Sequence, residues 1–206
     1  MNSGTLPRLQ VVVLAAGFSS RLGQPKALAR VHGQSLLRRT LTLVARFAPA
    51  RIIVVLPSIT ARYRHESRGL GALLTANVQR GDGLSSSVHR GIAQGRYSAA
   101  LLLLPVDLAI LNHRDMARLI ARWRRTPRRV AARAIGQHAG IPLILPRWLY
   151  SRSRRIAGDA GLRDMVKSLP AEQRVLLDLA SAAFDVDTPQ DLEHARHRLR
   201  STSFRP

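Results

Sequence analysis

The segment that decides the fold is residues 9–26, which read LQVVVLAAGFSSRLGQPK. Its first half is almost continuously apolar and rich in valine, a pattern typical of a strand that is buried on both faces of a parallel sheet. Its second half then brings two glycines and two cations: Gly17, Arg21, Gly23 and Lys26. Glycines let backbone N–H groups approach phosphate oxygens closely, and the cations supply positive charge. The stretch therefore predicts a phosphate-binding loop at the end of a central strand.

This loop differs from the two most familiar phosphate-binding patterns. Gly17 and Gly23 stand six residues apart and no Gly-Lys-Ser or Gly-Lys-Thr occurs, so neither the P-loop nor the dinucleotide fingerprint fits. A glycine turn beside ordinary surface cations is the alternative, because arginine is abundant throughout the chain. Of the 33 basic residues, however, only Lys26 and Lys167 are lysines. A lysine at the closing position of the loop favours the functional interpretation.

The rest of the chain alternates between predicted strands and predicted helices. Apolar runs and turn signals place further strands at 52–56, 73–78, 99–106, 130–134 and 141–145, and helices at 35–47, 60–68, 85–94, 112–125, from 147 onward and at 189–199. This alternation predicts a three-layer α/β/α sandwich, Rossmann-like, with a mainly parallel mixed sheet. We expect one domain over residues 1–200, fraying of the arginine-rich chain after Arg196, and a disordered tail at 201–206.

The composition narrows the classes of function. A formal charge of +21 attracts phosphates of any kind, whether in nucleic acid, a nucleoside triphosphate or a phosphorylated metabolite. Only 4% of residues are aromatic and they are not interleaved with the basic runs, which makes nucleic acid an unlikely partner. The absence of cysteine excludes disulfides and thiolate chemistry. No signal peptide or membrane-spanning run is recognisable, so we expect a cytoplasmic protein without a membrane partner.

Four segments, in order, carry a resemblance to a known family. LAAGFSSRLGQPK at 14–26 resembles the N-terminal loop of the nucleotidyltransferases that build molybdenum cofactor dinucleotides, which belong to the NTP transferase superfamily of GT-A-like fold. The three later segments are GDGLSSSVHRGI at 81–92, GDAGLRDM at 158–165 and DVDTPQDL at 185–192. The resemblance implies a magnesium-dependent enzyme that transfers a nucleoside monophosphate from an NTP to a phosphorylated pterin and releases pyrophosphate.

The resemblance also implies roles for individual residues. Those expected to bind the nucleotide are Leu14, Ala15, Ala16, Gly17, Arg21, Lys26, Ser85, Ser86 and Asp107, of which Arg21 and Lys26 are also the expected catalytic residues. Those expected to bind the acceptor are Gly140, Asp159 and Arg163, where a plain turn at 158–161 is the alternative. The expected partners are CTP (or GTP), the pterin acceptor, and a molybdoenzyme or its chaperone.

Three aspartates are the candidate magnesium ligands. Transfer of a nucleotidyl group needs charge neutralisation, which a divalent cation on a few carboxylates provides. Asp107 follows the apolar run at 99–106, at the strand end where α/β sheets place their ligands. Asp185 and Asp187 are expected on a short strand with both side chains on one face, and they compete for the second ligand position. The alternative is that Asp187 caps the next helix together with Thr188 and that Asp107 is a turn residue.

Two questions of specificity remain open at this level. The sequence Leu-Ala-Ala-Gly resembles cytidylyltransferases, whereas Leu-Ala-Gly-Gly is typical of guanylyltransferases, so Ala16 favours CTP over GTP. Gly140-Ile141-Pro142 departs from the Gly-His-Pro common in the family, and Ala109 replaces a common proline. These departures leave a sugar phosphate or another small phosphate as alternative acceptors. A basic nucleic-acid-binding protein is the alternative of another class, because six arginines lie within residues 122–133.

Overall fold

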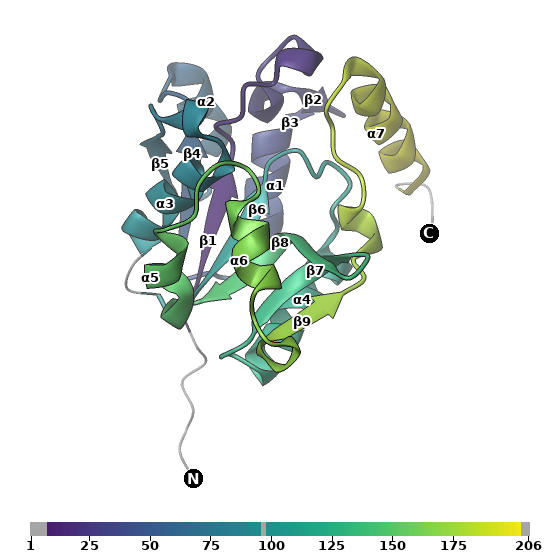
Figure 1. Ribbon diagram of the computed structural model, residues 1–206. Helices are drawn as coiled ribbons and strands as arrows, with labels where there is room; N and C mark the ends of the chain where they lie inside the picture. Colours follow the sequence, from purple (N-terminus) through teal and green to yellow (C-terminus); the bar gives the residue numbers. More distant parts are fainter. Residues whose placement is uncertain (1–7, 96–97, 203–206) are drawn as a thin grey trace.

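A seven-stranded mixed sheet forms the middle of the molecule, in the order β5-β4-β1-β6-β8-β7-β9 (Figure 1). The computed structural model describes residues 8–95 and 98–202. The strands are β1 (Leu9–Leu14), β4 (Arg51–Leu56), β5 (Ala72–Ala76), β6 (Ala100–Pro105), β7 (Val130–Ile135), β8 (His138–Pro146) and β9 (Arg174–Leu177). Strands β5, β4, β1 and β6 are parallel, β8 is antiparallel to both its neighbours, and β9 is parallel to β7. The predicted mainly parallel mixed sheet is confirmed.

The apolar run of β1 fills two separate cores. Val11 and Val13 pack into the cluster on one face of the sheet, and Val12 and Leu14 pack into the cluster on the other. This division follows from the pleat, which points successive side chains to opposite faces. A continuous run rather than an alternating one is required because helices cover both faces of β1. The sequence pattern and the three-layer fold therefore have the same physical cause.

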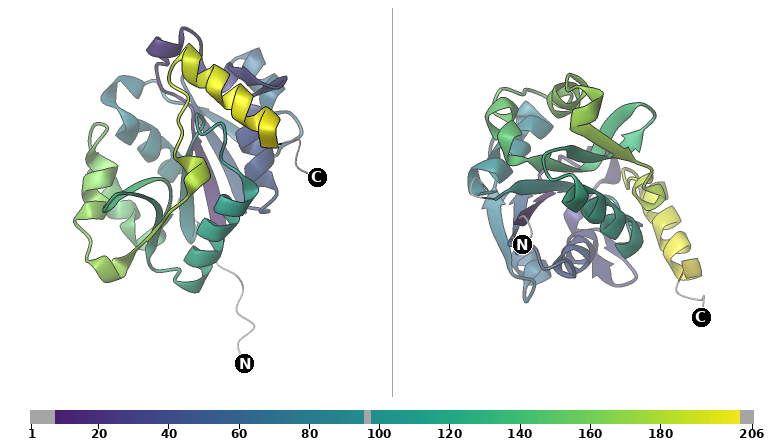
Figure 2. Two further views of the ribbon diagram at one scale, coloured as in Figure 1. Left: turned by 90° about the vertical axis from the view of Figure 1, so that its right-hand side faces the viewer. Right: turned by 90° about the horizontal axis from the view of Figure 1, so that it is seen from below.

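The helices divide between the two faces (Figures 1 and 2). The first face is covered by α1 (Leu36–Ala45), α2 (Ala61–Ser67), α4 (His113–Arg125) and α7 (Pro189–Thr202). The second face is covered by α3 (Leu84–Gly95), α5 (Tyr150–Ser153) and α6 (Gly161–Lys167). The predicted three-layer sandwich is confirmed. Within the described ranges, no helix is both long enough and apolar enough to span a bilayer.

Several predicted elements need correction. A two-residue hairpin, β2 (Arg30–Val31) with β3 (Gln34–Ser35), and the edge strand β9 were not predicted, because such short segments carry little periodic signal. The helix expected from residue 147 is instead a 3₁₀ turn followed by the short helix α5, with α6 beginning separately at Gly161.

The C-terminal region also differs from the prediction. Residues 184–188 form no strand, so the aspartates there lie on an irregular segment. Helix α7 begins at Pro189 as predicted but stays helical to Thr202, rather than fraying after Arg196. Leu199, which follows Arg196, packs partly buried against the first core, and this contact explains why the helix persists. The predicted tail beyond 202 lies outside the described residues.

Candidate active site

The loop after β1 is held in place by its own side chains. Leu22 and Ala27 are buried in the first core and anchor the part of the loop that follows its tip. The Oγ atom of Ser19 accepts a hydrogen bond from the backbone N–H of Lys26 at 3.1 Å, which closes the loop. Arg21 lies at the exposed tip, with 69% of its side-chain surface accessible. The loop therefore presents one exposed cation and one enclosed cation, Lys26, above the end of β1.

Backbone hydrogen bonds at the end of β6 bring the distant aspartates together. The carbonyl oxygen of Asp107 accepts from the N–H of Ala109 at 2.8 Å and from the N–H of Val186 at 3.0 Å. The second bond attaches the segment containing Asp185 and Asp187 to the end of β6. Residues far apart in sequence therefore meet at the carboxyl edge of the sheet, as expected for an α/β fold.

Lys26 is the centre of a network of ion pairs. Its Nζ atom donates to Asp107 Oδ2 at 2.9 Å and also contacts Asp187 Oδ1. Arg21 donates from its terminal nitrogen to Asp187 Oδ2 at 2.7 Å. The structure thus brings both predicted catalytic cations to two of the three predicted metal ligands.

The charged surroundings shift the pKa values of Lys26, Asp185 and Asp187. Burial by itself would lower the pKa of Lys26, but the attraction of Asp107 and the bond to Asp187 outweigh it, so this pKa is raised. The hydrogen bond from Lys26 lowers the pKa of Asp187. Desolvation, followed by repulsion from Asp107, raises the pKa of Asp185, although this residue keeps an exposed surface. Such opposed shifts among neighbouring groups are typical of functional sites.

The carboxylates fit a divalent cation, but not as a three-ligand cage. No cluster of three or more histidine, aspartate or glutamate side chains in the described part of the chain has the arrangement of a metal site. Asp107 and Asp187 nevertheless direct oxygens at one point, the Lys26 ammonium. Mg²⁺ commonly binds through one or two carboxylates together with substrate phosphates, so two converging carboxylates suffice.

The capping alternative for Asp187 does not match the geometry. Thr188 Oγ1 accepts from the N–H of Asp191 at 3.2 Å, and Asp191 Oδ2 accepts from the N–H of Thr188 at 2.8 Å. This reciprocal pair is a capping box for α7. The carboxylate of Asp187 is not needed there and faces Lys26 instead.

A cleft of about 380 Å³ opens beside this network. Of the predicted site residues it is lined by Leu14, Ala15, Ala16, Gly17, Lys26, Asp107 and Asp159. Two residues that the sequence analysis missed form part of its rim, where the Arg80 guanidinium stacks on the exposed Phe18 ring at 4.5 Å from the centroid. No sequence signal connects them, since they are brought together only by the fold.

The serines at the start of α3 are divided between two cavities. Ser87 lines the cleft, whereas the predicted Ser85 and Ser86 line a neighbouring cavity on the other side of the helix. The side-chain amide of Asn77 donates to Ser86 and Ser87 and is itself buried. The position of Ser87 within GDGLSSSV was visible in the sequence, but the rotation of the helix was not.

Asp159 has a structural role as well as a place in the cleft. Its Oδ1 accepts from the N–H of Leu84 at 2.7 Å and so caps α3 from a distant segment. Gly83 lies at φ +82°, and a Cβ added there would be 2.7 Å from this same oxygen. Glycine is therefore required at position 83 both by the backbone conformation and by the close approach of Asp159.

The other two predicted acceptor residues do not line the cleft. Gly140 belongs to β8, and a Cβ there would be 2.3 Å from Ile135 Cδ1, so packing of the β7–β8 hairpin explains this glycine. Arg163 is exposed on α6. Arg133 of β7 was missed, yet its charge opposes the rise in the pKa of Asp185.

A mixed sheet with a cationic glycine loop after its first strand, facing an aspartate at the end of β6, defines a nucleotidyltransferase. Residues 11–175 match the model of the MobA-like NTP transferase domain, and the chain belongs to this family. It is 29% identical to a probable molybdenum cofactor guanylyltransferase of Rhodopirellula baltica, over 90% of each chain.

Solved structures agree with this assignment of the fold. The chain is similar to Rv0371c from Mycobacterium tuberculosis H37Rv, with 25% identity, a TM-score of 0.73 and coverage of 94% of this chain and 100% of that one. A second structure of Rv0371c, in complex with manganese, gives a TM-score of 0.70 at 22% identity, with coverage of 94% and 100%.

Proposed function

We propose that this nucleotidyltransferase transfers CMP from CTP to the terminal phosphate of molybdopterin, with GTP as the alternative nucleotide. The observation that carries the proposal is the Lys26 ammonium, which joins Asp107 and Asp187 beside the glycine loop and its cleft. A phosphate-binding loop, a cleft of suitable size and converging carboxylates are the parts that nucleotidyl transfer requires.

The reaction needs no covalent enzyme intermediate. An oxygen of the acceptor phosphate attacks the α-phosphorus of the NTP, the bond from that phosphorus to the bridging oxygen breaks, and pyrophosphate leaves. Lys26 and Arg21 stabilise the negative charge that develops on the leaving group, because both are already directed to this end of the cleft. Backbone N–H groups around Gly17 hold the phosphates in place.

Asp107 and Asp187 would hold the divalent cation, with Asp185 as the alternative second ligand; when bound, Mg²⁺ supplies charge neutralisation at the phosphates. The structure of Rv0371c in complex with manganese supports the use of a divalent ion. Lys26 would be freed from Asp107 and Asp187 to contact phosphate when a cation occupies the carboxylates. In the absence of a cation, Asp107 and Asp187 raise the pKa of Lys26 and so keep its ammonium charged.

The choice of CTP rests on the floor of the cleft. Ala16 is almost completely buried and lines the cleft where guanylyltransferase-type sequences have glycine. Its methyl group narrows the floor, which favours the smaller pyrimidine. Ser87, rather than Ser85 or Ser86, is the side chain that we assign to the base. The name of the Rhodopirellula relative supports GTP instead. Calorimetric titration with CTP and GTP at equal Mg²⁺ decides between them, and Ala16→Gly should shift the preference toward GTP.

The experiment that tests the proposed activity is pyrophosphate release from CTP and GTP with molybdopterin, compared with sugar phosphates as acceptors. Asp107→Asn should lower the rate by at least about a hundredfold. Its stability should change by less than about 1 kcal/mol, because Lys26 keeps Asp187 as a partner. Asp178→Asn removes an exposed carboxylate outside the cleft and is the matched control. Full activity of Asp107→Asn, or release with no acceptor offered, would refute the assignment.

A further inference from the structure

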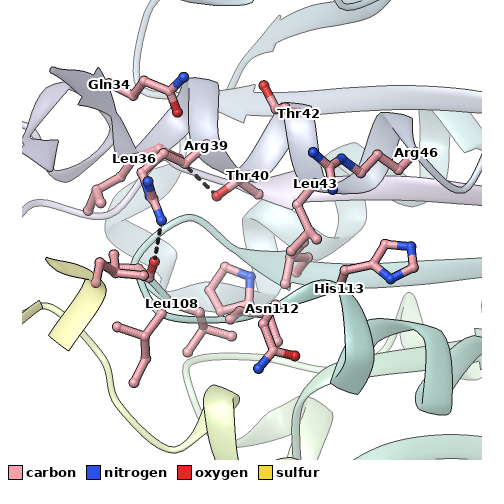
Figure 3. A pocket seen from close by; sticks show the side chains of 16 residues that line it. Gln34, Leu36, Arg39, Thr40, Thr42, Leu43, Arg46, Leu108, Asn112 and His113 are labelled. Atoms are coloured by element: carbon pink, nitrogen blue, oxygen red, sulfur yellow. Dashed lines mark hydrogen bonds between the residues drawn. The ribbon is translucent and has the colours of Figure 1, made fainter. Parts of the chain in front are cut away.

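A second cavity lies on the opposite side of the segment that follows β6 (Figure 3). It measures about 280 Å³ and is bounded by α1 on one side and by residues 108–113 on the other. Pro105 lines both this cavity and the nucleotide cleft, so the two are separated by little more than the chain around Asp107. None of the predicted site residues lines the second cavity.

The charged side chains of this cavity are two arginines, and no carboxylate compensates them. Arg39, Arg46 and His113 line it and no carboxylate does. Within the described ranges neither arginine forms an ion pair, and the Arg39 Nε is buried with no hydrogen-bond partner. Burial lowers the pKa of the Arg39 guanidinium. A buried guanidinium nitrogen without an acceptor is costly, so an oxyanion bound here would stabilise it.

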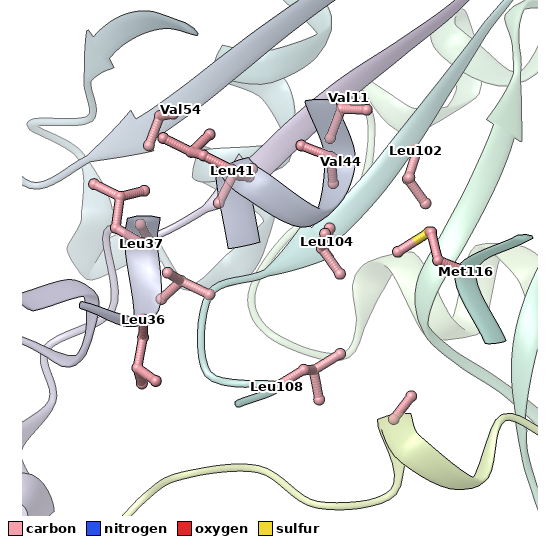
Figure 4. Packing of buried hydrophobic residues seen from close by; sticks show 14 of the residues in the cluster. Val11, Leu36, Leu37, Leu41, Val44, Val54, Leu102, Leu104, Leu108 and Met116 are labelled. Atoms are coloured by element: carbon pink, nitrogen blue, oxygen red, sulfur yellow. The ribbon is translucent and has the colours of Figure 1, made fainter. Parts of the chain in front are cut away.

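Most of the other lining residues are apolar. Leu36, Leu104 and Leu108 face the cavity and are also part of the first core (Figure 4). His113 is held by stacking on Phe47 at 4.7 Å between ring centroids. Side chains that are fixed by core packing form a preshaped pocket, which is the arrangement that binds a small ligand with an apolar body.

We propose that this cavity binds a small organic anion, in which a carboxylate or phosphate pairs with Arg39 and Arg46 and an apolar body rests on the leucines. Two guanidinium groups with no competing carboxylate select for negative charge, and planar forks favour oxyanions. The volume accommodates a body of about one aromatic ring but not a nucleoside triphosphate.

Two hydrogen bonds connect this cavity to Asp107, so a ligand bound here would change the surroundings of Asp107. A terminal nitrogen of Arg39 donates to the carbonyl of Ala109 at 3.5 Å, a long bond that an anion would readily replace. The N–H of Ala109 in turn donates to the carbonyl of Asp107 at 2.8 Å. A ligand that draws Arg39 away therefore removes one of the contacts that hold the segment carrying Asp107. Any effect on turnover rests on the proposed function, whereas binding and its effect on Asp107 do not.

A backbone-amide NMR titration of the full chain with benzoate tests the proposal. Benzoate should shift the amides of Leu111 and His113, and benzamide, its neutral counterpart, should bind at least about tenfold more weakly. Arg46→Gln removes an exposed charge at no cost to the core and should weaken benzoate about tenfold. Arg114→Gln, an exposed neighbour outside the cavity, is the matched control and should change nothing.

The coupling is read from the amides of Asp107 and Val186, which should shift with benzoate in the wild-type protein and not in Arg39→Gln. Equal binding of benzoate and benzamide, or unchanged binding in both arginine variants, would overturn the site. Shifts that gather instead at Gly17 and Arg80 would show that the anion occupies the nucleotide cleft, and would overturn it as well. Binding with no shift at Asp107 would overturn the coupling.

Discussion

Replacing Lys26 with methionine removes the charge at the centre of the site and keeps most of the length of the side chain. The ammonium lies 2.9 Å from Asp107 and also contacts Asp187, and 18% of its side-chain surface is exposed. At this distance the Coulomb energy of one pair is about 6 kcal/mol at an effective dielectric constant of about 20. Desolvation and partial exposure leave a net loss of about 1–2 kcal/mol. The melting temperature should therefore fall by about 2–8 °C.

The same change should lower turnover roughly a hundredfold, the scale expected for one charged transition-state contact. The melting difference has a defined pH dependence. The pKa of Asp187 is lowered below its ordinary value of 3.8, so its contribution is present above 3.8 and is lost as the pH falls through the value in the folded protein. Calorimetry from pH 3 to pH 7 should show the difference shrinking in acid.

The control is Lys167→Met, which replaces the only other lysine of the sequence, on the exposed surface of α6. It should keep both the melting temperature and the rate of the wild type. If Lys26→Met behaved like this control in both measurements, the assignment of Lys26 as the centre of the site would be wrong.

Three further changes test the surrounding structure. Gly83→Ala should destabilise the protein by about 1–3 kcal/mol and raise KM, because the added Cβ would lie 2.7 Å from Asp159. Gly71→Ala is the control: this glycine has φ +62° but faces open space, so its replacement should show only the smaller cost of the backbone conformation. Leu41→Ala empties a fully buried position of α1 visible in Figure 4 and should cost about 3 kcal/mol, measured by urea unfolding; a loss under about 1 kcal/mol would contradict the core described here. Asp185→Asn should raise the melting temperature by about 1–2 °C at pH 7. The pKa of Asp185 is raised above 3.8 in the folded protein, so its negative charge lowers the stability as the pH rises from 3.8 through the pKa of the folded state. That gain should be absent at pH 3, and a gain of equal size at both values would show that charge is not the cause.

Local features of the fold could be recognised from the sequence because they depend on neighbours in the chain. The apolar run of β1 and the proline at the start of α7 each determine local conformation directly, and both appear where predicted. The glycine loop that ends at Lys26 could be proposed as a phosphate-binding loop for the same reason, since it is a contiguous segment. Short elements such as β9 were missed, because four residues are too few to show a hydrophobic period or a distinctive composition.

The pairing of distant groups was decided only by the tertiary structure. The sequence by itself determined that Asp107 ends a buried strand, but the bond from Val186 to its carbonyl is what brings Asp187 to Lys26. The rotation of α3 about its axis places Ser87, and not Ser85, in the cleft, and this rotation depends on the packing of the helix against the sheet. Contacts between residues far apart in sequence depend on the whole packed arrangement, and no local pattern encodes them.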